Sequence, residues 1–225
     1  MSLAFIFQPT SASGLRKPAV LLTATFAAFV VYLTFAVATI AREVKTSADL
    51  TPAQLDDLGA AWLGLHVLWV VPPILAAIAL TSLSRRLQGA TRFVPAFAAV
   101  TIACAAAYIL VNLAAYGSET ATWGDNALYP WSVTLSLATG WFGVIPATIL
   151  VSTALAVGGV ARRTGWTVTA LVGLYWVIEL LTYVPVLLGP ETFAGFEGGL
   201  PPFLLGIAWA ILGGGLLRSR VPFQE

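Results

Sequence analysis

Long apolar runs alternate with short polar segments along the whole chain of 225 residues. A helix that crosses a bilayer needs about 20 mainly apolar residues in succession. Six runs are of about this length, over residues 19–41, 60–82, 93–115, 132–159, 166–188 and 200–217. The segments between them are rich in glycine, proline and polar residues, and each is too short for a soluble domain. We therefore predict a single all-α domain over residues 1–225, a polytopic membrane protein built as a six-transmembrane-helix bundle.

The positions of the basic residues predict how this bundle is oriented. Lysine and arginine collect in the cytoplasmic loops of membrane proteins. Most of the 11 basic residues fall on alternating ends of the apolar runs, and these are Arg16, Lys17, Arg85, Arg86, Arg92, Arg162, Arg163, Arg218 and Arg220. Only Arg42 and Lys45 fall on the opposite side. We expect both the N-terminus and the C-terminus to be cytoplasmic, and an error of one helix in the count would destroy the alternation.

The composition agrees with a membrane protein. Hydrophobic residues make up 59% of the chain and charged residues only 9%, whereas a soluble domain carries about a quarter charged residues. The apolar excess must therefore face lipid. The first run is longer than the apolar core of a secretory signal, which spans about 7–15 residues, so we expect a retained first helix. The excess of arginine over lysine, with abundant alanine and glycine, favours a bacterial plasma membrane.

Several classes of function lack the residues that they need. The single histidine, His66, cannot supply a haem held by two histidines, and with the single Cys104 it is too little for a zinc site. The chain contains neither a phosphate-binding loop of the form GxxxxGK[ST] nor an HExxH helix. The net charge of +1 gives no general attraction to nucleic acid. We expect no cofactor, no metal and no nucleic-acid partner.

Glu179 is the one acidic residue inside a predicted span. It precedes Leu188 by nine residues, so it lies about 13 Å inside the helix end. A charge at that depth costs several kcal/mol unless it is paired, hydrated or protonated, and such residues are functional candidates. Tyr175, Thr182 and Tyr183 lie on the same helical face. The alternative is a protonated glutamate that only hydrogen-bonds to a neighbouring helix.

Polar residues of other predicted spans lie at a similar depth. They are Tyr32 in the first span, His66 in the second, and Tyr108 and Asn112 in the third. Histidine titrates near neutral pH, so His66 and Glu179 are able to share a proton if the two side chains face each other. We predict a ligand or proton pocket that opens outward, formed by His66, Glu179, Asn112, Tyr108, Tyr175 and Tyr183. The alternative is that His66 is an ordinary packing residue and that the equal depths are accidental.

Rows of small residues predict close helix packing. Ala99, Ala103 and Ala107 recur every fourth residue, and glycines occur at Gly140, at Gly143 and from Gly213 to Gly215. Small side chains on one face let two membrane helices approach closely. These rows indicate a scaffold or a surface for a second protein, and they carry no chemistry.

The C-terminal third resembles a family of uncharacterised small bacterial six-helix membrane proteins. The resemblance rests on Arg163-Thr164-Gly165-Trp166 at the start of the fifth span, the segment from Gly189 to Pro202, and a last helix that ends at Arg218. It covers about the last 65 residues, and most of its motifs are of a kind that commonly flanks membrane helices. The family implies the six-helix architecture and no activity.

Two functions of different kinds remain open. The first is a non-catalytic accessory or structural subunit that binds a membrane-protein partner or a second copy of itself through its helix surfaces. The second is a small-molecule or proton-linked carrier or sensor that uses the pocket around His66 and Glu179. The scarcity of polar residues in the spans favours the first. An enzyme that acts on lipid is a third alternative, which no motif supports, so we do not expect catalysis.

Overall fold

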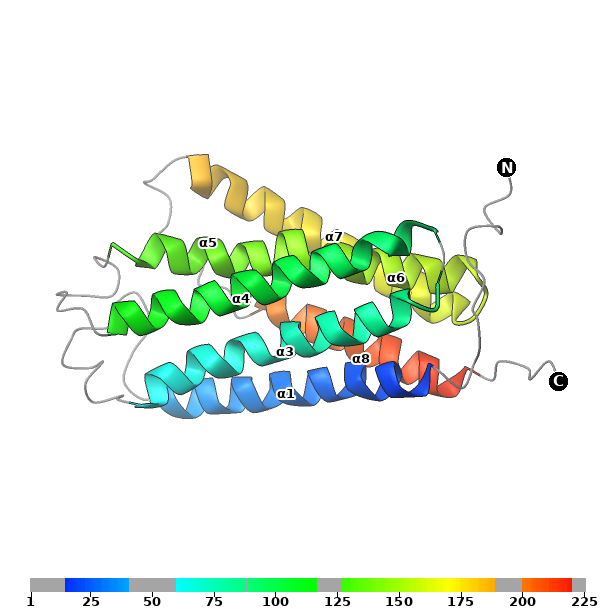
Figure 1. Ribbon diagram of the computed structural model, residues 1–225, viewed down its shortest axis with the longest axis horizontal. Coiled ribbons are helices and arrows are strands. Elements are labelled where there is room, and N and C mark those ends of the chain that lie inside the picture. Colours follow the sequence, from blue (N-terminus) through cyan, green and yellow to red (C-terminus); the bar gives the residue numbers. More distant parts are fainter. Residues whose placement is uncertain (1–14, 41–59, 88, 117–126, 189–199, 220–225) are drawn as a thin grey trace.

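The computed structural model describes residues 15–40, 60–87, 89–116, 127–188 and 200–219 (Figure 1). These residues form helices and contain no strand. The α-helices are α1 (Arg16–Ile40), α3 (Ala60–Ser84), α4 (Val94–Tyr116), α5 (Tyr129–Thr139), α6 (Ile145–Val157), α7 (Arg162–Leu188) and α8 (Leu200–Arg218). A short 3-10 helix, η3 (Gly89–Phe93), leads into α4, and a π-helical turn, η4 (Gly140–Val144), joins α5 to α6.

The described helices are compatible with a membrane bundle. Five of them are long and apolar enough to cross a bilayer, and a shorter apolar stretch, Leu204–Arg218, lies in α8. The predicted all-α class is therefore confirmed, with five to six apolar helices. The largest error in the predicted bounds is at α7, which begins at Arg162 rather than at residue 166. The apolar window missed this first turn because it is basic.

The spans follow one another around a closed ring. Each consecutive pair is in contact along the chain, from α1 with α3 to α7 with α8, and α1 with α8 closes the ring. Consecutive helices joined by short segments run antiparallel, as Figure 1 shows for α3 and α4. The second half of the fourth span also touches α3, α4 and η3. This span is consequently the most enclosed of the candidate membrane spans.

The fourth span is interrupted near its middle by η4. The backbone N–H of Ile145 bonds to the carbonyl of Gly140, five residues earlier, instead of the usual four. Pro146 follows directly and has no N–H to give to Phe142, and a proline ring collides with the carbonyl four residues before it. The helix widens by one residue ahead of the proline. Such π-helical turns are rare and often occur at functional sites.

The row of alanines expected to pack on α4 is not its buried face. Ala99 and Ala103 are exposed. The residues of α4 that are buried are Val94, Ala98, Thr101, Ala105, Tyr108, Asn112 and Ala115. Both sets are compatible with the sequence because lipid is as apolar as the bundle interior. The polar residues of α4 determine which face is buried, because their side chains need hydrogen-bond partners inside the bundle.

Several of the expected glycines do mark close helix contacts. A Cβ atom on Gly143 would overlap the Thr101 hydroxyl of α4 and lie 3.3 Å from its Cα. A Cβ on Gly213 would lie 2.7 Å from both the Ala19 carbonyl and the Thr23 hydroxyl of α1. Gly215 is similarly tight against Thr164 of α7. Glycine therefore permits the α1–α8 contact that closes the ring.

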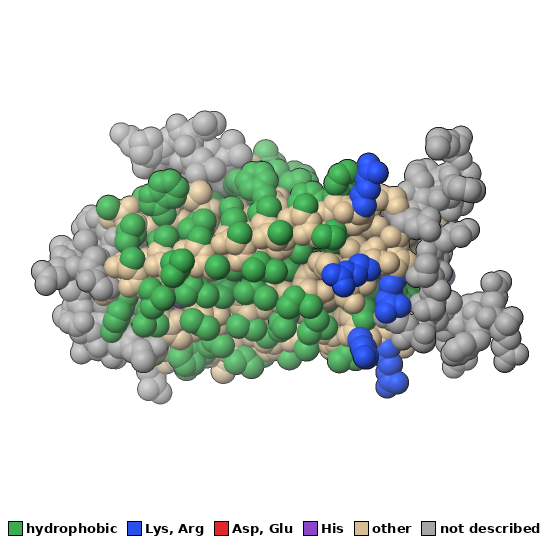
Figure 2. Space-filling view, viewed as in Figure 1, with side chains coloured by type: hydrophobic (Ala, Val, Ile, Leu, Met, Phe, Trp, Pro, Cys, Tyr) green, Lys and Arg blue, Asp and Glu red, His purple; other side chains and the backbone are tan. Residues whose placement is uncertain are grey.

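Basic side chains gather at one end of the bundle. Figure 2 shows arginine and lysine in a band at one end of an otherwise apolar surface. The described basic residues all lie at or near helix ends that the antiparallel order brings to this end, and they are Arg16, Lys17, Arg85, Arg86, Arg92, Arg162, Arg163 and Arg218. We refer to it as the basic end. The expected alternation of charge is thus present among the described residues.

Candidate functional site

Glu179 is held by two hydrogen bonds inside the bundle. It lies in α7 and is only 8% exposed. The indole N–H of Trp141 donates to its Oε2 across 2.7 Å, and the hydroxyl of Tyr175 donates to its Oε1. Tyr175 is one helical turn earlier on α7, whereas Trp141 belongs to η4. One carboxyl group therefore joins the fifth span to the irregular turn of the fourth.

These two partners allow Glu179 to change its protonation state without losing its position. An indole N–H can only donate, so Oε2 accepts in either state. A tyrosine hydroxyl can donate to a carboxylate or accept from a carboxylic acid. Both bonds therefore survive when a proton is added at Oε1. The site is able to take up and release a proton with little rearrangement of its neighbours.

A cavity of about 110 Å³ lies beside Glu179. The cavity is lined by residues from every span except the third. They are Phe29, Trp69, Pro72, Pro73, Ser136, Leu137, Thr139, Gly140, Val144, Tyr175, Glu179, Leu205 and Trp209. A water molecule occupies about 30 Å³ of liquid, so this space is enough for about three or four waters or one small molecule. It is smaller than the roughly 300–1,000 Å³ of sites for drug-sized ligands.

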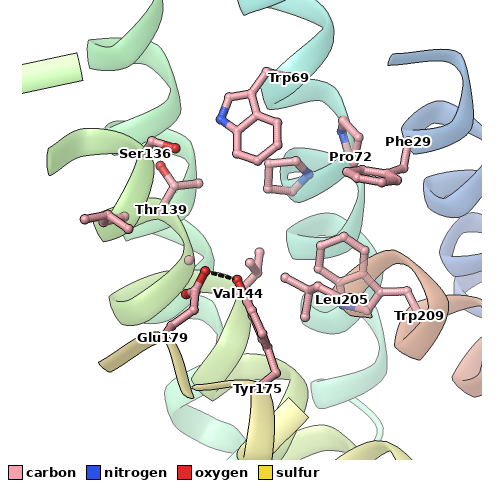
Figure 3. Close-up of a pocket in the computed structure, with 13 residues that line it drawn as sticks. Phe29, Trp69, Pro72, Ser136, Thr139, Val144, Tyr175, Glu179, Leu205 and Trp209 are labelled. Carbon is pink, nitrogen blue, oxygen red and sulfur yellow. Dashed lines mark hydrogen bonds between the residues drawn. The ribbon is translucent and has the colours of Figure 1, made fainter. Parts of the chain in front are cut away.

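The lining is mostly apolar and includes four aromatic side chains, with the polar groups gathered on one side. Figure 3 shows Trp69, Phe29 and Trp209 around the cavity, with Glu179, Ser136 and Thr139 opposite them. Trp209 is fixed because its indole N–H donates to the Thr148 hydroxyl at 3.0 Å. Aromatic faces attract cations, and rings arranged as a cage are used to bind quaternary ammonium groups. A carboxyl among such rings suits a small organic cation or a proton.

His66 belongs to a second hydrogen-bonded group. Its Nδ1 lies 2.8 Å from the hydroxyl of Tyr108 on α4. The two rings are also in contact, with centroids 5.4 Å apart. Neither residue lines the cavity beside Glu179. Trp69 connects the two regions, because it packs against the Tyr108 cluster and also lines that cavity.

Asn112 extends this second group toward α5. Its Nδ2 donates to the backbone carbonyl of Tyr108 at 2.8 Å and to the hydroxyl of Ser132 at 3.0 Å. Asn112 and Ser132 are both buried. The arrangement satisfies a polar side chain that would otherwise be costly inside an apolar bundle. Asn112 is thus a tie between α4 and α5.

The expected single pocket is therefore divided into two groups. The structure brings Glu179 together with Tyr175, and it brings His66 together with Tyr108 and Asn112. The side chain of Tyr183 lies outside the described residues. Depth was estimated from position along each helix, and that estimate cannot tell which way a side chain points. Glu179 is hydrogen-bonded to Trp141 and Tyr175, and Nδ1 of His66 is paired with Tyr108. No direct hydrogen bond between His66 and Glu179 therefore supports the prediction that they share a proton.

The sequence interpretation missed the residues that complete the cavity. Trp141 and Trp209 had no role assigned to them, and Gly140 was taken only as a packing residue. A signal was available, since an indole N–H in the middle of an apolar span requires an acceptor. The pattern of Gly140, Gly143 and Pro146 also marked the fourth span as irregular.

No family model matches the sequence, and no curated protein or solved structure matches it. Across the described parts of the chain, no three histidine, cysteine or acidic side chains come together as a metal site would require.

Proposed function

We propose that this chain is a multi-pass carrier or sensor that binds a small organic cation or a proton at Glu179. The observation behind the proposal is a buried carboxyl group that lines a cavity inside an apolar bundle. Ionisable groups at such positions are costly, and they usually mark a pathway or a binding site. The four aromatic side chains of the lining support a cationic ligand, and the size of the cavity limits that ligand to a few heavy atoms.

The same proposal includes an orientation. Both termini lie on the cytoplasmic side of a bacterial plasma membrane, because the basic end then follows the positive-inside rule. The opposite end of the bundle, where α3 and α5 begin, then faces the exterior (Figure 1). Labelling of single cysteines at Arg85 and at Trp131 by a membrane-impermeant maleimide tests this orientation in intact cells, in a Cys104→Ala background. The variant at residue 131 is expected to react, and the variant at residue 85 is expected to react only after lysis.

Binding of tetramethylammonium by the purified protein tests the ligand proposal. Isothermal titration calorimetry in nanodiscs is expected to show saturable binding to the unmodified chain. The Glu179→Gln variant retains an acceptor for Trp141 but no charge. It should bind at least about 30-fold more weakly, since loss of a buried charge partner costs about 2–5 kcal/mol.

The matched control is His66→Gln. It also replaces an ionisable side chain in a span, but the residue lies in the second hydrogen-bonded group. Its affinity for tetramethylammonium should stay within about threefold of the original, the range expected for sites that share no partner. Equal loss in both variants would mean that the ligand site is not centred on Glu179.

An accessory role remains the second candidate, supported by the exposed alanines of α4. Ala99 and Ala103 are small, lie one turn apart and face outward. Gly213 and Gly215, the other expected docking residues, are already occupied by contacts within the chain. An Ala103→Cys variant that lacks Cys104 should form a crosslinked dimer or hetero-complex if α4 is an interface. Leu174→Cys, on the exposed face of α7, serves as the control position.

A further inference from the structure

An open groove lies at the basic end, between the start of α7 and the end of α8. Its volume is about 610 Å³. Three arginines from two helices line it, namely Arg162 and Arg163 on α7 and Arg218 on α8. All three are exposed. The groove shares no lining residue with the cavity at Glu179, and it is several times larger.

The charge in this groove is unbalanced within the described chain. The first turn of α7 contains no acidic residue. The positive end of a helix dipole disfavours cations, and the first N–H groups of a helix have no acceptor within it. The sole acidic residue within the described ranges is Glu179, which lies more than four turns further along α7. The three guanidinium groups therefore have no acidic partner among the described residues, and they favour an anionic ligand in the groove.

The backbone that carries these arginines is fixed by close packing. Gly159 turns the chain between α6 and α7 with a φ of 75°, a conformation that L side chains rarely adopt. Gly165 packs against α6 so closely that a Cβ would lie 2.5 Å from the carbonyl of Ser152. On the other side, Gly215 of α8 packs against Thr164. The walls of the groove are therefore two helices in direct contact.

The groove lies at one end of the apolar surface of the bundle. It is at the basic end, where the apolar surface of the bundle finishes (Figure 2). Trp166 is one helical turn from Arg162 on the same face of α7, and it is exposed. Exposed tryptophans are enriched at the membrane–water interface. The arginines of the groove and the exposed Trp166 near it are the residue types that membrane proteins place at this interface.

We propose that this groove binds the phosphate of an anionic phospholipid headgroup. Guanidinium groups suit phosphate because they donate paired hydrogen bonds to its oxygens. Basic pockets between transmembrane helices are known to select anionic lipids. The lipid source is favoured over a soluble phosphate because the groove opens at the edge of the apolar surface.

Native mass spectrometry of the full chain tests the lipid site. The protein is purified in detergent and equilibrated with equal amounts of phosphatidylglycerol and phosphatidylcholine that carry the same acyl chains. The unmodified chain is expected to retain phosphatidylglycerol in preference. The triple variant Arg162→Gln, Arg163→Gln, Arg218→Gln should lose roughly hundredfold in affinity for it, at about fivefold for each arginine near the surface.

A second triple variant provides the matched control. Arg16→Gln, Arg86→Gln, Arg92→Gln removes the same charge from the same end, and none of these residues lines the groove. It should keep the preference for phosphatidylglycerol. If both triple variants lose it equally, the attraction is a general property of the basic end and the groove is not a site.

Two further arms complete the test. Replacement of the three groove arginines by lysine keeps the charge and loses the paired geometry, so the affinity should be intermediate. Titration of the lipid-free protein with inorganic phosphate separates the two sources of phosphate. Saturable binding of inorganic phosphate together with no lipid preference would overturn the lipid proposal, whereas lipid retention that excess phosphate leaves in place supports it.

Discussion

Trp141 donates its indole N–H to Oε2 of Glu179 across 2.7 Å and thereby joins the π-helical turn of the fourth span to the fifth span. The bond ties together two unusual features of the molecule, a widened helix and a carboxyl group inside an apolar bundle. The π-helical turn and the buried carboxyl group therefore depend on each other. The turn presents an indole donor toward α7, and the donor keeps Glu179 in place beside the cavity.

Replacement of Trp141 by phenylalanine should destabilise the protein through loss of this bond. The expected decrease in the free energy of unfolding is about 1–3 kcal/mol, the cost of leaving a buried acceptor without its donor. Thermal unfolding in detergent, followed by circular dichroism, measures the effect.

Trp176→Phe is the matched control for that variant. It makes the same change in the neighbouring span, and the indole N–H of Trp176 is buried without a hydrogen-bond partner among the described residues. Its effect should be at least about 1 kcal/mol smaller than that of Trp141→Phe. Equal losses would show that only ring packing matters at Trp141.

Adjacent glycines of α8 test the contact that closes the ring. Gly213→Ala places a methyl group 2.7 Å from two oxygen atoms of α1. It should destabilise the fold by about 1–3 kcal/mol, as overpacking does. Gly214→Ala meets nothing within 4 Å, so it should be neutral or stabilising by up to about 1 kcal/mol, since alanine favours the helix. Equal unfolding midpoints in the two variants would contradict the close contact between α1 and α8 that closes the ring of helices.

A similar comparison tests the position of the π-helical turn. Gly143→Ala would bring a methyl group against Thr101 of α4, close to its backbone. We expect a loss of about 1–3 kcal/mol, which Thr101→Ala in the same chain relieves in part. Gly173→Ala, in the middle of α7 with nothing within 4 Å, should be tolerated. Absence of any relief in the double variant would mean that the two helices do not meet there.

The separation of the two hydrogen-bonded groups is tested by double-mutant cycles on stability. Tyr175→Phe and Glu179→Gln remove partners of one bond, so their effects should depart from additivity by about 0.5–3 kcal/mol. His66→Gln and Glu179→Gln belong to different groups, so their effects should add within about 0.5 kcal/mol. Strong coupling between His66 and Glu179 would restore the single pocket that matched depths suggested.

The apolar helices and their approximate limits were predictable from a simple rule for chains in lipid. A backbone in hydrocarbon must satisfy its own hydrogen bonds, so long apolar runs form helices. The position of Glu179 inside a span followed from the same count. The first turn of α7 was missed because α7 begins with Arg162 and Arg163, so the helix starts before the apolar run does.

The faces of the helices were harder to predict. In a soluble helix an apolar stripe marks the buried side, but both lipid and the bundle interior are apolar. The alanines of α4 therefore looked like a packing face, whereas the buried face contains Thr101, Tyr108 and Asn112. For the same reason the depths of His66 and Glu179 were informative and their directions were not. The π-helical turn depends on how Pro146 and its neighbours pack, which no periodicity in the sequence reveals.

Infrared difference spectroscopy on ligand addition tests the central role of Glu179 most directly. Tetramethylammonium is added to the protein in lipid, and the carboxyl region of the spectrum is compared before and after. We predict a change in a carboxyl band that persists in His66→Gln and disappears in Glu179→Gln. A spectrum that does not change on binding, or a band that survives in Glu179→Gln, would contradict the account.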